Sequence, residues 1–165
     1  MRIIGVDPGY GIVGVGIVER KGNRILYVHH CAIETSEELE RGERLERIYE
    51  EFLRILDDFS PEECAMERLF FVKNITTAIG VGEARGVILL ALHRRGIPVF
   101  EYNPNEVKLA VTGYGRAQKA QVQENMRRLL GLSEIPRPDD AADALAIAWC
   151  HAVQSRLRGI TGEKV

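Results

Sequence analysis

The sequence lacks an apolar run long enough to cross a membrane, and it lacks a marked excess of charge of either sign. The apolar residues after Arg2 are interrupted by Asp7 and Pro8, which is not the pattern of a secretory signal peptide. The formal net charge of -2 excludes a small, generally basic nucleic-acid-binding protein. If the protein binds DNA or RNA, its positive charge must be concentrated locally. Together these absences predict a cytoplasmic protein that does not insert into a membrane.

Cysteine and histidine are also scarce, and neither shows the spacing of a zinc site. The odd number of cysteines and their wide separation predict reduced thiols in a reducing compartment. The histidines are expected to lie in the core or on the surface, without a catalytic role. These residues are Cys31, Cys64, Cys150, His29, His30, His93 and His151.

The composition is that of an ordinary globular protein, with 45% hydrophobic and 28% charged residues. A chain of 165 residues fits one domain. Such a chain can bury roughly 70% of its unfolded surface, so it needs no disulfide or metal for stability. We therefore expect a single domain over residues 1–165, with a short disordered tail near residues 159–165.

Apolar periodicity predicts three strands at the N-terminal end and then strands that alternate with helices. The first three strands are close enough in sequence to form an antiparallel meander. The pattern predicts an α/β fold, in which a mixed five-stranded sheet has three antiparallel strands followed by two parallel ones and helices on both faces. The predicted strands are Arg2–Asp7, Val13–Val18, Arg24–Glu34, Cys64–Phe71 and Ile97–Tyr102. The predicted helices are Glu38–Phe59, Asn74–Arg95, Pro104–Val111, Gln118–Leu130 and Asp140–Arg158. The Gly-rich segment Thr112–Ala117 is predicted to be a mobile loop.

Four acidic residues stand at unusual places in this pattern. Asp7 ends the first strand, Glu67 lies within an apolar run, and Asp140 and Asp143 share one face of the first turn of the last helix. Each has an ordinary explanation on its own: a turn residue, an ion pair with Arg68, or charges that suit the N-terminus of a helix. An ionised carboxylate among apolar neighbours is nevertheless costly unless it is paired or binds a metal.

Taken together, the four carboxylates predict a site for a hard divalent cation such as Mg²⁺. In two-metal nuclease sites the ions lie roughly 4 Å apart, where one activates water and the other stabilises the leaving oxygen. Asp139 is an alternative to Asp140, because positions 139 and 143 also share a helix face. The sequence does not choose between them.

Five motifs occur in an order and spacing that resemble the RuvC family of Holliday-junction resolvases, members of the RNase H-like superfamily. The resemblance covers almost the whole chain. The motifs are Ile4-Gly5-Val6-Asp7-Pro8-Gly9, Met66-Glu67-Arg68-Leu69-Phe70, Ala84-Arg85-Gly86, Phe100-Glu101-Tyr102 and Asp140-Ala141-Ala142-Asp143-Ala144-Leu145-Ala146.

The resemblance implies a homodimeric endonuclease that nicks two like strands of four-way junction DNA and leaves 5′-phosphate ends. It implies that Asp7, Glu67, Asp140 and Asp143 are catalytic and bind two Mg²⁺ ions, for which Mn²⁺ can substitute. It also implies a branch-migration helicase complex as partner.

The resemblance places a DNA-stacking aromatic at Phe70 and DNA-binding lysines at Lys108 and Lys119. Arg116 lies in the loop between these lysines and is added to the predicted DNA-binding set. A solvated basic surface is the ordinary explanation for the same residues. Small residues recur at Ala78, Gly82 and Gly86, where they either pack on the protein's own sheet or form the dimer interface that the family suggests.

Other functions fit less well. Gly9, Gly11 and Gly14 form a G-x-G-x-x-G pattern, but a strand follows it, whereas a dinucleotide-binding motif opens a helix. An actin-like ATPase needs two such domains around its nucleotide. Another RNase H-like nuclease, of the ribonuclease H or pre-ribosomal-RNA type, and a non-catalytic binding module remain as alternatives.

Overall fold

The computed structural model describes residues 1–9, 11–68 and 75–161. Within them, five strands form one sheet in the order β3-β2-β1-β4-β5. β1 pairs antiparallel with β2, and β2 with β3, whereas β1 and β5 each pair parallel with β4. This arrangement confirms the predicted mixed sheet. The strands are β1 (Arg2–Pro8), β2 (Ile12–Lys21), β3 (Arg24–Glu34), β4 (Glu63–Glu67) and β5 (Val99–Tyr102).

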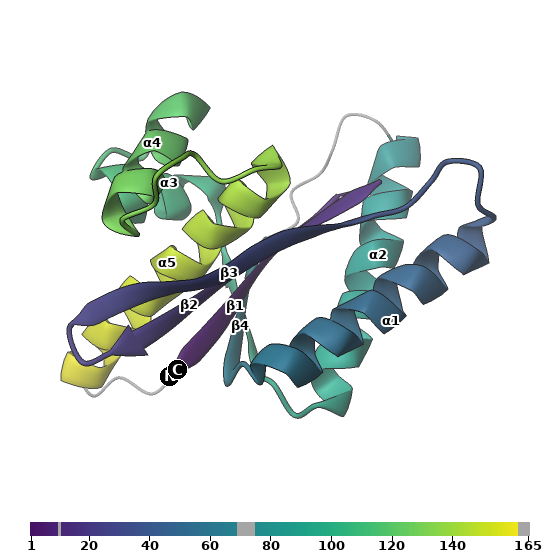
Figure 1. The fold of residues 1–165 in the computed structure, drawn as a ribbon, viewed down its shortest axis with the longest axis horizontal. Helices are drawn as coiled ribbons and strands as arrows, with labels where there is room; N and C mark the ends of the chain where they lie inside the picture. Colours follow the sequence, from purple (N-terminus) through teal and green to yellow (C-terminus); the bar gives the residue numbers. More distant parts are fainter. Residues whose placement is uncertain (10, 69–74, 162–165) are drawn as a thin grey trace.

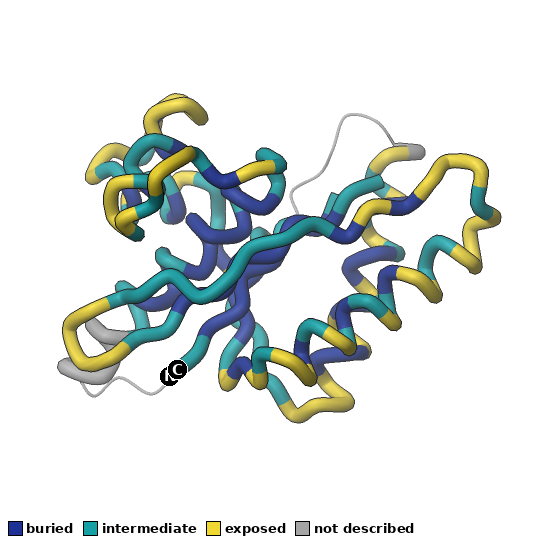
Figure 2. Tube along the Cα trace, viewed as in Figure 1, coloured by how far each residue is buried: buried dark blue, intermediate teal, exposed yellow. Residues whose placement is uncertain are grey.

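Helices cover both faces of the sheet, as Figure 1 shows. α5 lies along one face with α3 and α4 beside its N-terminal half, and α1 and α2 pack together on the other side. Figure 2 shows that burial is concentrated in the central strands and α5, while α1 is exposed along its outer side. The helices are α1 (Arg41–Phe59), α2 (Ile75–Arg94), α3 (Pro104–Thr112), α4 (Lys119–Leu129) and α5 (Asp139–Thr161). None of these helices is long and apolar enough to serve as a membrane span, over the part of the chain that the structure describes.

Most elements have ends that differ from the predicted ones, usually by one or two residues, and β2 continues to Lys21 instead of ending at Val18. α1 begins at Arg41, three residues later than predicted, because the carboxylate of Glu43 accepts the backbone N–H of Glu40 at 2.9 Å and so stabilises a start there. β4 ends at Glu67, four residues before the predicted Phe71. α5 continues to Thr161, beyond its predicted end and into the predicted tail, of which residues 162–165 lie outside the described part.

The early end of β4 follows from its neighbour. β5 ends at Tyr102, because Asn103 caps α3 by accepting the backbone N–H of Glu106 at 3.0 Å. β4 therefore has no strand to pair with on that side beyond Glu67. Residues 69–74, which include the predicted stacking residue Phe70, lie outside the described residues.

Three glycines allow α5 to lie directly on the backbone of β1 and β2. A Cβ added at Gly5 would lie 2.1 Å from the carbonyl oxygen of Ala144, and one added at Gly14 would lie 2.0 Å from that of Asp140. At Gly16 the added atom would lie 2.4 Å from the backbone nitrogen of Leu145. The alternation of glycine with valine and isoleucine in β2 is thus a strand pattern, and its glycines also provide the surface on which this helix packs.

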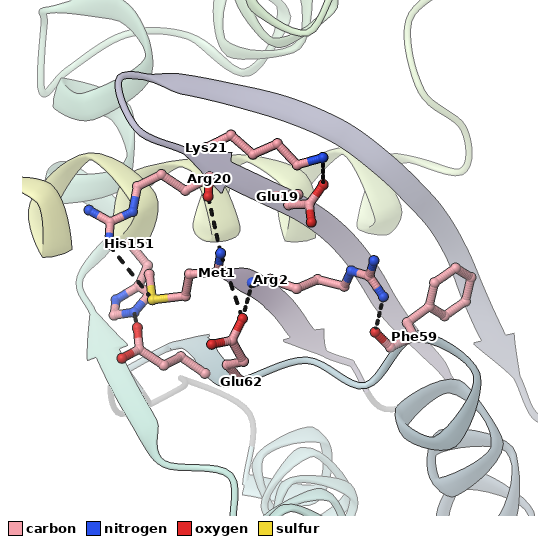
Figure 3. A network of polar contacts seen from close by, with 9 residues as sticks. Met1, Arg2, Glu19, Arg20, Lys21, Phe59, Glu62 and His151 are labelled. Atoms are coloured by element: carbon pink, nitrogen blue, oxygen red, sulfur yellow. Dashed lines mark hydrogen bonds and ion pairs between the residues drawn. The ribbon is translucent and has the colours of Figure 1, made fainter.

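The N-terminal end of β1 is fixed by the polar network in Figure 3. The amino group of Met1 donates to the carbonyl of Arg20 at 3.1 Å, and the backbone N–H of Arg2 donates to the carboxylate of Glu62 at 2.9 Å. The guanidinium of Arg2 donates to the carbonyl of Phe59. These bonds tie β1 to β2 and to the segment that connects α1 with β4.

A buried histidine of α5 bonds this helix to two strands of the sheet. His151 is 0% exposed, and its ring nitrogens lie 2.6 Å from the hydroxyl of Tyr102 and 2.6 Å from the carboxylate of Glu63. These partners belong to β5 and β4, so His151 locks the helix against two neighbouring strands. The prediction of a core histidine without a catalytic role is consistent with this position.

Candidate active site

Asp7 and Glu67 lie side by side at the carboxyl ends of two parallel strands. Val6 and Met66 are register partners, and the two acids directly follow them. Side chains alternate along a strand, so Asp7 points to the same side as Ile3 and Gly5, which face α5. Both acids therefore approach the face of the sheet that α5 covers.

The first turn of α5 brings Asp140 and Asp143 to the same place. Gly14 is the register partner of Asp7 on β2, and a Cβ added at Gly14 would lie 2.0 Å from the carbonyl oxygen and 2.9 Å from the Cβ of Asp140. Asp140 thus lies against the strand position next to Asp7. Asp143 follows one helical turn later, on the same side of the helix.

The electrostatics show that these acids act on one another. The pKa of Asp7 rises from its ordinary value of 3.8 to about 7, because burial disfavours its charge and because Asp143, Glu67 and Asp140 lie close by. Burial and the charge of Asp143 raise the pKa of Glu67, although Lys108 acts in the opposite direction. The structure therefore gathers carboxylates whose simultaneous ionisation is unfavourable.

Lys119, the first residue of α4, supplies positive charge at this point. Its ammonium donates to the carboxylate of Asp143 at 2.8 Å and lies 3.8 Å from that of Asp139. Burial tends to lower the pKa of Lys119, but the bond to Asp143 and the surrounding acids outweigh it, and the pKa is raised. Burial raises the pKa of Asp143, although its bond to Lys119 acts in the opposite direction.

The donor chemistry of the cluster fits a hard divalent cation. Carboxylate oxygens are the ligands that Mg²⁺ prefers, and the two lysines at the site do not offset four neighbouring acids. Over the described ranges, no three Asp, Glu, His or Cys side chains form a group already arranged to hold a metal ion. The carboxylate of Asp143 is engaged by the ammonium of Lys119 at 2.8 Å. Asp7, Glu67, Asp140 and Asp143 are the residues that could hold the ion.

Asp140 and Asp139 differ in their surroundings. Asp140 is among the charges that raise the pKa of Asp7. Asp139 forms an ion pair with Arg137 and lies near Lys119. Its carboxylate is therefore already engaged by two cationic side chains at the edge of the cluster.

A cavity of about 240 Å³ opens beside the acids. Glu67, Asp143, Lys108 and Lys119 contribute to its lining, so both predicted DNA-binding lysines lie at the site. Its apolar wall consists of Pro104, Val107, Val122, Ala146 and Ile147. A cavity with carboxylates and lysines at one place suits an anionic substrate whose charge a cation bridges to the acids.

Comparison with known proteins agrees with this geometry. Residues 3–151 match the family model described as "Crossover junction endodeoxyribonuclease RuvC". The chain belongs to the RuvC family. It is 71% identical over 161 residues to the family member from Thermotoga petrophila, covering 98% of each chain, and 70% identical over 164 residues to that from Thermotoga maritima, covering 99% of this chain and 98% of the relative.

Solved structures extend the comparison to the fold. "T. thermophilus RuvC in complex with Holliday junction substrate" superposes with a TM-score of 0.90 at 40% identity, covering 95% of this chain and 96% of the other. The yeast mitochondrial Holliday junction resolvase Ydc2 has a TM-score of 0.70 at 13% identity, covering 97% of this chain and 81% of its own, which shows a shared fold alone. The predicted family and its RNase H-like fold are confirmed.

Arg116, a further predicted DNA-binding residue, is not among the described residues that line the cavity beside the acids. Arg116 is exposed in the segment between α3 and α4. This segment was predicted to be a mobile loop from its glycines, and in the structure it contains a hydrogen-bonded turn. Thr112 Oγ1 accepts the backbone N–H of Tyr114 at 3.1 Å, and the carbonyl of Tyr114 accepts the N–H of Ala117 at 3.1 Å. Glycine content alone does not reveal such bonds.

Arg85 is a residue of the RuvC-family motifs to which the sequence assigned no role. It lies on α2, is only 6% exposed, and donates to the backbone carbonyl of Glu67 at 2.9 Å. It also forms an ion pair with Glu101 on β5. Arg85 thus fixes the end of β4, and with it the backbone that carries Glu67. Its signal in the sequence was an arginine in the middle of a largely apolar helix.

The raised pKa of Asp7 predicts how stability depends on pH. The folded protein binds a proton more tightly than the unfolded chain, so the free energy of unfolding falls as pH rises from about 4 to about 7 and then levels off. The shift from 3.8 to about 7 corresponds to at most about 4 kcal/mol. Asp7→Asn removes this cost, so in EDTA at pH 8 the variant should be more stable than the wild type by up to this amount.

Urea denaturation at pH 5 and pH 8 measures this effect. The advantage of Asp7→Asn should be larger at pH 8 than at pH 5, and added Mg²⁺ should stabilise the wild type more than the variant. Equal stability of the two proteins at both values of pH would contradict the assigned environment of Asp7.

Proposed function

We propose that the protein resolves Holliday junctions by metal-dependent nicking of two like strands of a four-way DNA junction. The observation that carries this proposal is the convergence of Asp7, Glu67, Asp140 and Asp143 from β1, β4 and α5, with mutual effects on their pKa values. Membership of the RuvC family, and the Holliday junction substrate in the complex of the T. thermophilus relative, support the choice of DNA substrate.

In this proposal the four carboxylates hold Mg²⁺, with two ions in each site, and Mn²⁺ can substitute. The ions supply Lewis-acid polarisation of the phosphodiester and lower the pKa of the attacking water. Lys108 and Lys119 bind the substrate phosphates, and Arg116 and Phe70 extend the contact with DNA. In-line attack of water on the phosphodiester releases a 3′ hydroxyl and leaves a 5′ phosphate, so a ligase can seal the products. We place the reaction in the cytoplasm, with a branch-migration helicase complex as partner.

The test is a synthetic four-way junction labelled on each strand in turn. With Mg²⁺, two like strands should be cut at symmetric positions. In EDTA or Ca²⁺ the junction should remain bound and uncut. Cleavage that persists in EDTA, or equal cleavage of linear duplex, would overturn the proposal. Preferential cutting of an RNA–DNA hybrid would instead favour the alternative, a nuclease of the ribonuclease H type.

Lys119→Ala should weaken junction binding and make its salt dependence shallower. Each phosphate contact contributes about 0.9 to the magnitude of the slope of log affinity against log salt concentration. The slope for the variant should therefore be smaller in magnitude by about this amount. Titrations at several salt concentrations in Ca²⁺ measure the slope. Lys21→Ala is the matched control, because Lys21 is exposed on β2 at the other end of the sheet. An unchanged slope for Lys119→Ala would remove this lysine from the proposed DNA surface.

We also propose that α2 forms the interface of a homodimer. Ile79, Leu89 and Leu90 of α2 are exposed, with Leu90 at 52%. Gly82 and Gly86 lie on the same helix, and a Cβ added at either would meet nothing within 4 Å. Exposed large apolar side chains beside open glycines allow a second helix to approach closely.

Leu90→Glu should convert this dimer to a monomer, because two carboxylates would be buried across a two-fold interface. Sedimentation at micromolar concentration measures the mass. Leu129→Glu is the matched control, since Leu129 is an exposed leucine at the end of α4. A wild-type protein that sediments as a monomer, or a Leu90→Glu variant that sediments as a dimer, would contradict the interface.

A further inference from the structure

Tyr114 occupies an exposed position in a hydrogen-bonded turn between α3 and α4. Its side chain is 60% exposed, more than any other large apolar side chain in the described part of the chain. Thr112 Oγ1 accepts the N–H of Tyr114 at 3.1 Å, and the same hydroxyl donates to the carbonyl of Lys108 at 2.8 Å. Gly113 adopts a left-handed φ of 74° and ends α3 by donating to Leu109. The aromatic ring is therefore presented to solvent from a hydrogen-bonded backbone.

A depression of about 390 Å³ lies beside this ring. Its lining includes Tyr114, Ala120, Gln121, Glu124 and Asn125, the last four from α4. The side-chain oxygen of Gln121 accepts the backbone N–H of Gln118 at 2.9 Å, which directs the amide NH₂ of Gln121 as a donor. The NH₂ of Asn125 donates to the carbonyl of Val111 at 3.3 Å, which leaves the amide oxygen of Asn125 as an acceptor.

These groups suit a neutral, planar ring better than a phosphate. Glu124 lines the depression, and hydrogen bonds from Arg127 and Arg128 lower the pKa of Glu124 to about 2, so this carboxylate is ionised at neutral pH. Two arginines thus offset the charge of Glu124, and no lysine or arginine is among the described residues that line the depression, so a phosphate would lack a cationic partner in the lining. An aromatic face together with one amide donor and one amide acceptor matches the π-face and the edge of a nucleobase.

Neighbouring residues of α4 line this depression and the cavity beside the acids. Lys119 and Val122 line the cavity beside the acids, whereas Ala120 and Gln121 line this depression, so the two lie on different sides of the first turn of α4. The width of a helix, about 10 Å with its side chains, separates them. A DNA strand that crosses Lys119 from the acids reaches Tyr114 within a few nucleotides.

We propose that Tyr114, Gln121 and Asn125 form a pocket for one unstacked nucleobase of the junction, a few nucleotides from the phosphate that is cut. Tyr114 stacks on the base, and the two amides bind its edge. The pocket contributes affinity and selects among bases at that position. This inference rests on the proposed function, because it takes a four-way junction as the substrate.

The first experiment measures junction binding in Ca²⁺ by fluorescence anisotropy. Tyr114→Ala should bind about tenfold more weakly than the wild type, a loss typical of one stacked base. Tyr114→Phe keeps the ring and should bind within about twofold of the wild type, because stacking needs only the π-face. Leu129→Ala is the matched control, since it shortens another exposed apolar side chain of this helical pair, and it should bind like the wild type.

A second experiment locates the base. Junctions that carry a single abasic nucleotide are compared at each position on either side of the nick. At one position the wild type should lose about tenfold in affinity, while Tyr114→Ala should lose nothing further, because the ring and the base contribute through one contact. At that position 2-aminopurine should be quenched by the wild type and not by Tyr114→Ala. This optical readout also covers the case in which the alanine variant folds poorly, because Tyr114→Phe should still quench.

The outcomes separate the pocket from the function. A wild-type protein that neither binds nor cuts the junction refutes the proposed function itself. A wild-type protein that binds and cuts, together with a folded Tyr114→Ala variant of equal affinity, refutes only the pocket. Losses that simply add at every abasic position also refute it, because they show that no base depends on Tyr114.

Discussion

Glu67→Gln is expected to reduce Mg²⁺-dependent nicking of a four-way junction on the order of 1,000-fold while junction binding in Ca²⁺ persists. The substitution keeps the size of the side chain and removes the charge that a divalent cation needs. Loss of about 4 kcal/mol of transition-state stabilisation corresponds to this factor. Binding should persist, because the lysines proposed to contact phosphate are unchanged and one repelling carboxylate is gone.

Glu63→Gln is the matched control for this experiment. Glu63 begins the strand that Glu67 ends, and its carboxylate is bonded to His151 at the opposite end of β4. This variant should nick at a rate near that of the wild type at a temperature where it is folded. Single-turnover rates with saturating protein separate chemistry from binding. Nicking by Glu67→Gln within a few-fold of the wild type would show that Glu67 does not act on the reacting phosphate.

Gly14→Ala is expected to lower the free energy of unfolding by about 3 kcal/mol or more. The new Cβ would lie 2.0 Å from the carbonyl oxygen of Asp140, so the backbone of α5 has to move away from β2. Overpacking against a flexible side chain is usually milder, but here the obstacle is main chain. Nicking should fall further than the folded fraction does, because the displaced turn carries Asp140.

Urea denaturation gives the stability change, and nicking is measured at a temperature where both proteins are folded. Gly42→Ala in α1 is the matched control, since an added Cβ there meets nothing within 4 Å. This control should gain about 0.5–1 kcal/mol, as expected when alanine replaces glycine in a helix. A Gly14→Ala protein as stable as the wild type would show that α5 does not rest on β2 as described.

The sequence predicted what depends on local periodicity. Strand alternation and helical spacing gave every element, with ends shifted where a distant partner decides them. β4 is the clearest case: its apolar residues continue past Glu67, but its neighbour β5 stops at Tyr102, where Asn103 caps α3. Such an end depends on a strand more than thirty residues away, so no local pattern contains it.

The site was predictable in its residue types and only partly in its geometry. Motif order pointed to the four acids, but Asp139 and Asp140 could not be separated from helical spacing. The choice depends on how α5 is rotated against the sheet, and the contact between Gly14 and Asp140 sets that rotation. Arg85 was missed for a similar reason, because its bond to the carbonyl of Glu67 joins two segments 18 residues apart.

The seat of α5 on Gly5, Gly14 and Gly16 has a consequence for redesign of the enzyme. Because backbone packs directly against backbone here, the helix has no room to shift, and changes in β1, β2 or the start of α5 that aim to alter DNA preference would disturb the proposed catalytic carboxylates. α3 and α4 instead join the core through interchangeable aliphatic side chains such as Val107, Val111, Val122 and Met126. Away from Lys108 and Lys119, that helical pair is the place where substrate selectivity can be changed with the least effect on the proposed catalytic carboxylates.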